Sequence, residues 1–431
     1  MVENSKISRR KLVVGTAWAA PAVLASTTVP AYAASSAHRI CPNNSRITAA
    51  EANYHELVVP DGAVSLYFEL VGGAGGYLNP LPPKSYATAG HGAQISGDFE
   101  VTPGQILKIY LGSSGQAFGT RPAEGGAGYG KGGSSKLSPS SVIPAEEQKI
   151  LTDLKADSTV IYGGSGGGSS AIVAVDPANP AKETVLVIAG GGGGAGLRGT
   201  ADDSRNTSDH KRDASWDNYS SPYMGMGGDS TEFYGGDGGS VEEEFYGYHN
   251  YYGFYEGKKL LVHGGKRGLG GEGGKGSDPA EIPNLDPLVF KSIEQTPVTI
   301  RTMSTTGGVG GDGMRANGAD GVAAYGYAYS THKFYDDDAN ASEYVHAVSG
   351  FAVSPGGGAG YGGGSSGGVL ALGMQRYDEH SGEVYAIGMG VTMGGGGSGD
   401  SYISPDIDSP LFMTATNLES GYLEYNFCFN A

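Results

Sequence analysis

Runs of consecutive glycine follow directly on runs of strand-forming residues, and this juxtaposition constrains the fold more than any other feature of the chain. Residues 185–196 read VLVIAGGGGGAG, and residues 65–76 repeat the pattern as SLYFELVGGAGG. Glycine accounts for 77 of the 431 residues, well above its usual share of about 7%. Tyrosine (27) and phenylalanine (12) are also frequent, whereas disordered chains are poor in aromatic residues. We therefore expect a folded, glycine-built protein.

Residues 1–33 have the pattern of a cleaved export signal. A basic start, MVENSKISRRKL, precedes the short apolar stretch VVGTAWAAPAVLA, and AYA (31–33) offers a small-residue cleavage site that leaves Ala34 as the first mature residue. The SRRKL segment (8–12) resembles a twin-arginine signal, with the Sec route as the alternative. We expect a secreted or cell-surface-associated protein with no transmembrane segment in the mature chain.

Charge and cysteine content agree with a role outside the cell. The chain has 28 Lys+Arg and 45 Asp+Glu, a net charge of −17, which disfavours nucleic acid and anionic membranes as partners. The two cysteines, Cys41 and Cys428, lie near the two ends of the mature chain. In an exported protein such a pair is expected to form a disulfide. The first and last strands should therefore be neighbours, since the bond requires Cα atoms within about 7 Å of each other.

Alternating apolar residues and turn signals predict strands on both sides of the first glycine run. Residues 54–71 are expected to form two strands joined by a Pro-Asp-Gly turn, and residues 91–115 two strands joined by a Pro-Gly turn. In the last of these strands Leu107 and Ile109 would share one face, with Tyr110 on the other. Further expected elements are a helix within 138–158, strands within 158–175 and 183–196, strands and loops at 283–302 and 402–420, and a final strand at 421–429.

Residues 197–262 differ from their surroundings and are expected to be an insertion into the glycine framework. This stretch is charged at first and then rich in tyrosine among small polar residues, a composition typical of adaptable recognition loops. The alternative is that its tyrosines cover exposed edges of sheets and glycine segments. The candidate ligand-binding residues are Tyr234, Tyr246, Tyr248, Tyr251, Tyr252 and Tyr255.

Several glycine-rich motifs resemble functional signatures but lack the context that these signatures need. Ser165 and Ser365 match a nucleophile elbow without the following helix. Residues 125–131 nearly match a phosphate loop but lack its hydroxyl. Residues 307–315 match one calcium repeat without a tandem copy, and the acidic stretch 335–343 departs from the EF-hand pattern. We expect no enzymatic activity, no catalytic residue, no metal and no cofactor.

The order of motifs resembles a known family. A strand followed by VGGAGG, a VTPGQ turn, VLVIAGGGGGAG, then GGGGSGDSYI and a closing GYLEY strand are similar to the glycine-rich domain of the extracellular region of anaplastic lymphoma kinase and leukocyte tyrosine kinase receptors, which also occurs in bacterial exported proteins. The resemblance covers roughly 54–196 and 263–427. It implies an all-β, jelly-roll-like β-sandwich that frames a bundle of polyglycine II helices, within a single glycine-rich domain at 34–431.

Packing physics explains why such a bundle requires glycine. A threefold extended helix has no internal hydrogen bonds, so its N–H and C=O groups point outward and must find partners on neighbouring helices. A Cβ atom would hold those neighbours apart. The glycines assigned to this core are Gly72, Gly73, Gly190, Gly191, Gly192, Gly193, Gly194, Gly356, Gly357, Gly394, Gly395 and Gly396.

These features together favour an exported, non-enzymatic binding or adhesion protein whose partner is an extracellular protein or glycan. The alternative is a structural cell-wall or matrix component with no specific ligand. The sequence does not fix the ligand, the oligomeric state, or the choice between wall anchoring and free secretion.

Overall fold

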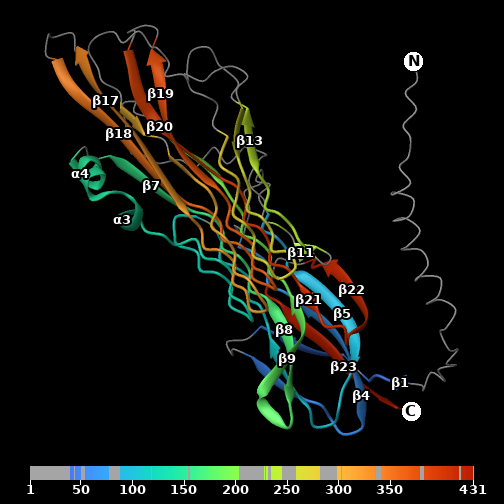
Figure 1. Ribbon diagram of the computed structural model, residues 1–431. Helices are drawn as coiled ribbons and strands as arrows, with labels where there is room; N and C mark the ends of the chain where they lie inside the picture. The colour runs from blue at the N-terminus through green and yellow to red at the C-terminus, as the bar shows by residue number, and fades with distance from the viewer. Residues whose placement is uncertain are drawn as a thin grey trace, which may run out of the picture. The chain divides into compact units, whose positions relative to one another are not determined.

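A computed structural model describes residues 39–42, 44–49, 54–76, 88–117, 119–153, 156–202, 228, 230–231, 234–244, 259–281, 299–301, 303–335, 341–378, 383–416 and 419–430 (Figure 1). The chain divides into two compact units. The smaller comprises Met1–Ile40 and Asn430–Ala431, and its described part includes strand β1 (Arg39–Ile40). The larger, Cys41–Phe429, contains the sheets and glycine segments described below.

Two antiparallel sheets of the larger unit pack face to face. In the first, β23 lies between β2 and β4, and β5 and β22 follow β4. The second has the order β21-β9-β8-β6-β3. The strands of the first sheet are β2 (Ser45–Thr48), β4 (Ala63–Val71), β5 (Ala93–Glu100), β22 (Asp408–Thr414) and β23 (Tyr422–Asn430). Those of the second are β3 (His55–Val58), β6 (Ile106–Tyr110), β8 (Ser170–Asp176), β9 (Asn179–Ala189) and β21 (Tyr402–Ile403).

Alternating apolar side chains from both sheets form the core of this sandwich. Phe68 and Ile95 of the first sheet lie in one buried cluster with Leu107, Ile109 and Ile172 of the second. Each such side chain contributes roughly 1.5–3 kcal/mol when fully buried. The predicted inward face of residues 107 and 109 is confirmed, as is the all-β, sandwich-like class of the fold.

The two predicted turns connect opposite sheets. The Pro60–Gly62 turn leads from β3 in the second sheet to β4 in the first, and the Pro103–Gly104 turn leads from β5 in the first sheet to β6 in the second. Gly62 has a φ of +80° and Gly104 a φ of +81°, which glycine adopts without steric cost. The sequence predicted the turns but not that each one crosses the sandwich.

The disulfide predicted between the two cysteines is confirmed. Cys41 and Cys428 are bonded, with Cα atoms 4.2 Å apart. The neighbouring strands agree, because Ser45–Thr48 of β2 pairs antiparallel with β23. One covalent bond therefore links the first and last parts of the larger unit.

A second pair of sheets is built from the later part of the chain. Their orders are β15-β17-β18-β7 and β10-β20-β19-β16. Ile161 from the first of these sheets shares a buried cluster with Val369, Val391 and Met393 from the other. The strands are β7 (Asp157–Tyr162), β10 (Arg198–Asp202), β15 (Thr299–Arg301), β16 (Met303–Thr305), β17 (Ala323–Tyr335), β18 (Ala341–Val353), β19 (Val369–Asp378) and β20 (Glu383–Met393).

The remaining elements are short. Helices α3 and α4 fall within the stretch where the sequence predicts one helix. Two small ribbons join β11 to β12 and β13 to β14. Their bounds are α3 (Pro139–Val142), α4 (Ala145–Asp153), β11 (Ser230–Thr231), β12 (Tyr234–Gly235), β13 (Val241–Glu244) and β14 (Lys259–Val262).

The glycine runs leave the strands as extended segments that bond to one another (Figure 1). Run 190–194 continues directly from β9 and is fully buried. Its N–H groups at positions three apart reach the same neighbour, because Gly191 donates to Ala359 and Gly194 donates to Gly356. Residues 190–195 find their hydrogen-bond partners in six other described segments: 73–76, 90–93, 164–167, residue 228, 356–359 and 396–401.

Candidate binding face

An apolar row with a tyrosine at each end crosses the outer face of the second sheet of the sandwich, and its members Tyr110, Ala171 and Ile188 are buried. In the strand register, Tyr110 of β6 lies opposite Ala171 of β8, which lies opposite Ile188 of β9. Ile188 in turn pairs with Tyr402 of β21. At the β3 edge, the ring of Tyr54 lies 5.5 Å from that of Tyr110. Because side chains alternate along a strand, this row faces away from the sandwich core.

Two further tyrosines from glycine segments pack onto this row. The ring centroid of Tyr129 lies 5.0 Å from that of Tyr110, in an edge-to-face arrangement. The ring of Tyr361 lies 5.2 Å from that of Tyr402. Both added tyrosines are partly buried against the apolar residues of the sheet. We call Tyr54, Tyr110, Tyr129, Tyr361 and Tyr402 the tyrosine face.

Arg315 places a positive charge on the tyrosine face. Its Cζ lies 4.4 Å from the ring centroid of Tyr129 and 5.1 Å from that of Tyr110, within the range of a cation–π interaction. Its side chain is exposed, and it has no ion pair with any residue that the structure describes. Burial raises the pKa of Tyr129, and the charge of Arg315 opposes that rise.

A second cation borders the face and is neutralised. Lys108 Nζ lies 5.1 Å from the ring centroid of Tyr54 and 2.6 Å from Oε1 of Glu183. The hydrogen bond to Glu183 raises the pKa of Lys108. The face therefore combines aromatic rings with a cation in an ion pair, Lys108, and one without an ion pair among the described residues, Arg315. Such an arrangement suits a ligand with a flat apolar side and a polar rim.

The sequence contains a repeated signal for part of this face, separate from the tyrosines of residues 197–262. The pentapeptide GAGYG occurs twice, at 126–130 and 358–362, and each copy supplies one of the tyrosines that cover the row. The remaining rings come from strands far apart in the chain. Only the strand register brings Tyr54, Tyr110 and Tyr402 onto one row.

The tyrosines predicted to bind ligand are placed differently. Tyr234 lies in β12, opposite Thr231 of β11. The others, Tyr246, Tyr248, Tyr251, Tyr252 and Tyr255, lie outside the described residues. Glycines of this stretch belong to the glycine network, since Gly228 donates its N–H to Gly396 and Gly238 to Gly265. Binding by these tyrosines stays a prediction.

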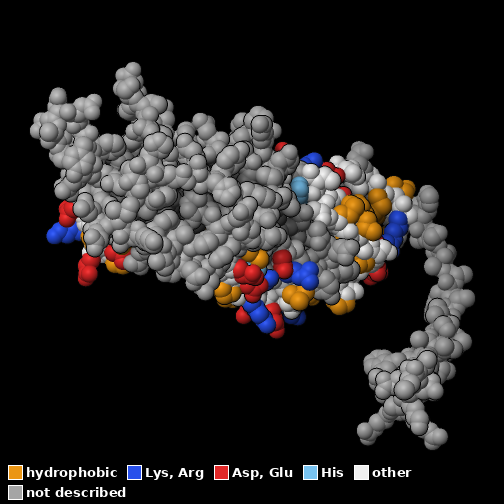
Figure 2. Space-filling model, turned by 90° about the horizontal axis from the view of Figure 1, so that it is seen from above, with side chains coloured by type: hydrophobic (Ala, Val, Ile, Leu, Met, Phe, Trp, Pro, Cys, Tyr) orange, Lys and Arg blue, Asp and Glu red, His pale blue; other side chains and the backbone are white. Residues whose placement is uncertain are grey.

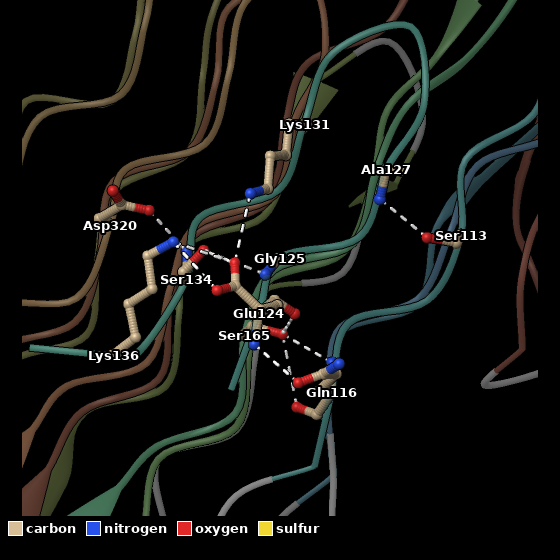
Figure 3. Close-up of polar contacts among 10 residues, drawn as sticks. All are labelled: Ser113, Gln116, Glu124, Gly125, Ala127, Lys131, Ser134, Lys136, Ser165 and Asp320. Atoms are coloured by element: carbon tan, nitrogen blue, oxygen red, sulfur yellow. Dashed lines mark hydrogen bonds and ion pairs between the residues drawn. The ribbon is translucent and has the colours of Figure 1, made fainter. Parts of the chain in front are cut away.

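Ser165, which matched a nucleophile elbow, lies in a polar network that ties segments together (Figure 3). Its buried hydroxyl accepts the N–H of Gln116 at 2.6 Å and donates to the carbonyl oxygen of Glu124 at 2.6 Å. The Glu124 carboxylate pairs with Lys136 at 3.1 Å and Lys131 at 3.3 Å, and these hydrogen bonds lower its pKa. The network fixes backbone positions and offers no free nucleophile.

Two other residues from these motifs also form hydrogen bonds with backbone groups. Ser365 is buried, and its hydroxyl accepts the N–H of Lys266 at 2.6 Å. Asp312, in the stretch that matched a calcium repeat, accepts the N–H of Gly273 at 2.7 Å. Within the described part of the chain, no group of three or more His, Cys, Asp or Glu residues is placed to hold a metal ion.

Charges of both signs lie close together on the described surface. Figure 2 shows acidic and basic side chains next to one another on one face. Independently of that view, Glu124 forms ion pairs with Lys131 and Lys136. Among the described helices, none has the length and apolar character needed to cross a membrane.

Comparison with known proteins finds no relative of the chain. No protein-family model matches the chain, and no curated protein matches it.

Proposed function

We propose that this chain is an exported, non-enzymatic binding or adhesion protein whose partner is an extracellular protein or glycan. The tyrosine face is the observation that carries the proposal. Its tyrosines lie on the outer side of one sheet in two ring groups, Tyr54–Tyr110–Tyr129 and Tyr361–Tyr402, and the exposed Arg315 lies over the first. Tyr and Arg are the residues that most often dominate binding energy at interfaces.

We infer that the glycine segments are polyglycine II helices that hold this face rigid. The three-residue spacing of hydrogen-bond partners along run 190–195 supports this, because a threefold extended helix returns to the same side every third residue. A preorganised support lowers the entropic cost of binding. The same geometry supports membership of the glycine-rich domain family.

The proposal includes export of the protein from the cytoplasm. The signal-like segment at residues 1–33 and the disulfide between Cys41 and Cys428 both fit a protein that works outside the reducing cytoplasm. The structural alternative draws on the glycine network itself, which would give stiffness and protease resistance without a ligand.

An array of surface glycans and host matrix proteins tests the binding function. The probe is the mature chain, residues 34–431, in its disulfide-bonded form. The double variant Tyr54→Ala/Tyr129→Ala should lose at least about tenfold in affinity for any ligand found. The matched control is Tyr67→Ala, because Tyr67 is 43% exposed on a strand of the opposite sheet.

The outcome separates the two classes of function. Binding that survives in the double variant would move the site away from the tyrosine face. A complete lack of ligands, with wild-type protein that resists proteases, would favour the structural role instead.

A further inference from the structure

We propose that the tyrosine face recognises an acidic sugar, with the sugar carboxylate at Arg315 and the sugar ring against the tyrosines at the β3 edge. The inference rests on the binding function proposed above and names its ligand class. Three observations on the described residues carry it: an unpaired guanidinium, exposed aromatic surface beside it, and a polar pair at the rim.

The first observation is a contrast between two arginines that lie over tyrosine rings. Arg46 Cζ lies 4.0 Å from the ring centroid of Tyr422, and its Nη1 lies 3.3 Å from Oε1 of Glu424. Arg315 has the same kind of ring contact but no carboxylate partner among the described residues. In a chain of net charge −17, an exposed arginine without such a partner has its N–H donors available for a ligand.

The chemistry of the guanidinium selects the ligand's charged group. Its N–H donors match the two oxygens of a carboxylate in a bidentate pair. Contact with the rings of Tyr129 and Tyr110 restricts where the group can lie, so less side-chain entropy is lost when a carboxylate binds.

The second observation selects a sugar as the carrier of that carboxylate. Tyr54 is 37% exposed, and its ring lies at the sheet edge, 5.5 Å from the ring of the buried Tyr110. A hexuronate has a ring face of C–H groups that suits an aromatic surface, and it carries its carboxylate on the same residue. An acidic peptide would satisfy Arg315 but would bring no such ring for Tyr54.

The third observation concerns the hydroxyl groups of a sugar. Lys108 and Glu183 form an ion pair at the rim, with side chains 20% and 36% exposed. An ammonium and a carboxylate held together offer both donors and acceptors to hydroxyls at the edge of the ring. The pair's mutual neutralisation leaves Arg315 as the group that distinguishes a charged sugar from a neutral one.

Isothermal titration of the mature, disulfide-bonded chain with three probes tests the proposal. The probes are trigalacturonate, the neutral galactose trimer and triglutamate. Trigalacturonate should bind, and the other two should bind at least about tenfold more weakly. Equal binding of the neutral trimer would overturn the role of the carboxylate, and equal binding of triglutamate would overturn the role of the sugar ring.

Variants then locate the site. Arg315→Gln should weaken trigalacturonate binding about tenfold or more. Arg315→Lys should give an intermediate loss, because lysine keeps the positive charge but not the paired N–H donors of the guanidinium. Arg46→Gln is the matched control and should bind as the wild type does. An unchanged Arg315→Gln affinity, or an equal loss in Arg46→Gln, would overturn the assignment, and thermal melts of both variants check that each is folded.

The design separates this inference from the binding function on which it rests. A chain that binds another ligand on the array through the tyrosine face, but not trigalacturonate, overturns the acidic-sugar assignment and leaves the binding function standing. A chain that binds nothing overturns both.

Discussion

Gly192 donates its backbone N–H to the carbonyl oxygen of Gly73 at 3.0 Å, although the two residues belong to different glycine runs that follow different sheets. The carbonyl oxygen of Gly192 accepts a hydrogen bond from Gly167 at 2.9 Å in a third run. Each run therefore satisfies its buried backbone groups through its neighbours, as buried polar groups must be satisfied. Strand-forming residues precede the glycine runs because the strands position the runs. Without side chains, the backbones of neighbouring runs can then approach closely.

Gly192→Ala should destabilise the protein by about 2–3 kcal/mol or more. An added Cβ would lie within 3.0 Å of the carbonyl group of Gly90, a separation that real Cβ atoms essentially never show. Gly308→Ala is a milder comparison, since its Cβ would meet the backbone oxygen of Asp320 at 3.2 Å, a contact that a shift of a few tenths of an ångström relieves. Thermal melts should show a fall of several degrees for the first variant and a clearly smaller fall for the second. Equal melting temperatures would contradict close packing of the runs.

Removal of the disulfide should lower stability by on the order of 4 kcal/mol, because the bond closes a loop of nearly the whole chain. Cys41 and Cys428 are 387 positions apart. The Cys41→Ser/Cys428→Ser variant should unfold at lower denaturant concentration than the oxidised wild type. A reducing agent should shift the wild type and leave the variant unchanged. Two free thiols in protein purified without a reducing agent, measured by mass spectrometry, would contradict the bond.

Ser165→Ala should cost about 0.5–1.5 kcal/mol, because it removes the buried hydroxyl that bonds the partly buried N–H of Gln116 and carbonyl of Glu124. Ser140→Ala is a control, since the hydroxyl of Ser140 lies in an exposed pair with Ser138. Chemical denaturation measures both. Covalent labelling of Ser165 by a serine-directed phosphonate would contradict a structural role, because its hydroxyl is fully buried.

Local patterns in the sequence predicted the elements of the sandwich better than their partners. The alternation at Leu107 and Ile109 fixes which face is buried, because period two leaves no other choice. Pro60–Gly62 predicts a turn because its residue types suit one. Whether the strands on either side pair with each other or lie in opposite sheets depends on contacts far away in the chain, and no local pattern carries that information.

The tyrosine face also depends on contacts between residues far apart in the chain, which local sequence patterns do not predict. Composition drew attention to tyrosines clustered in sequence at 219–255, whereas the rings that meet in the described structure are scattered from Tyr54 to Tyr402. The repeated GAGYG pentapeptide marks Tyr129 and Tyr361, yet their meeting with the sheet depends on strand register. No sequence pattern marks Arg315 as a site residue. The segment around it matched only a calcium repeat, which does not predict a role for the arginine.

Asp400 is a buried carboxylate at the edge of the glycine network. Its side chain accepts backbone N–H groups of Gly270 and Ser401. Burial raises its pKa to about 6 from an ordinary value of 3.8, although these hydrogen bonds and the charge of Arg267 oppose the rise. The folded protein thus binds this proton more tightly than the unfolded chain does. The contribution to stability is fully present below about pH 4 and is lost as the pH rises through about 6.

Asp400→Asn should remove this pH dependence. The free energy of unfolding of the wild type, relative to the variant, should therefore increase by on the order of 2–3 kcal/mol between about pH 7 and about pH 4. Glu124→Gln should show the opposite sign, because Lys136 and Lys131 lower the pKa of Glu124 and its contribution is lost as the pH falls. Urea titrations across this pH range measure both differences. A constant difference between wild type and Asp400→Asn would show that this carboxyl does not change its proton affinity on folding.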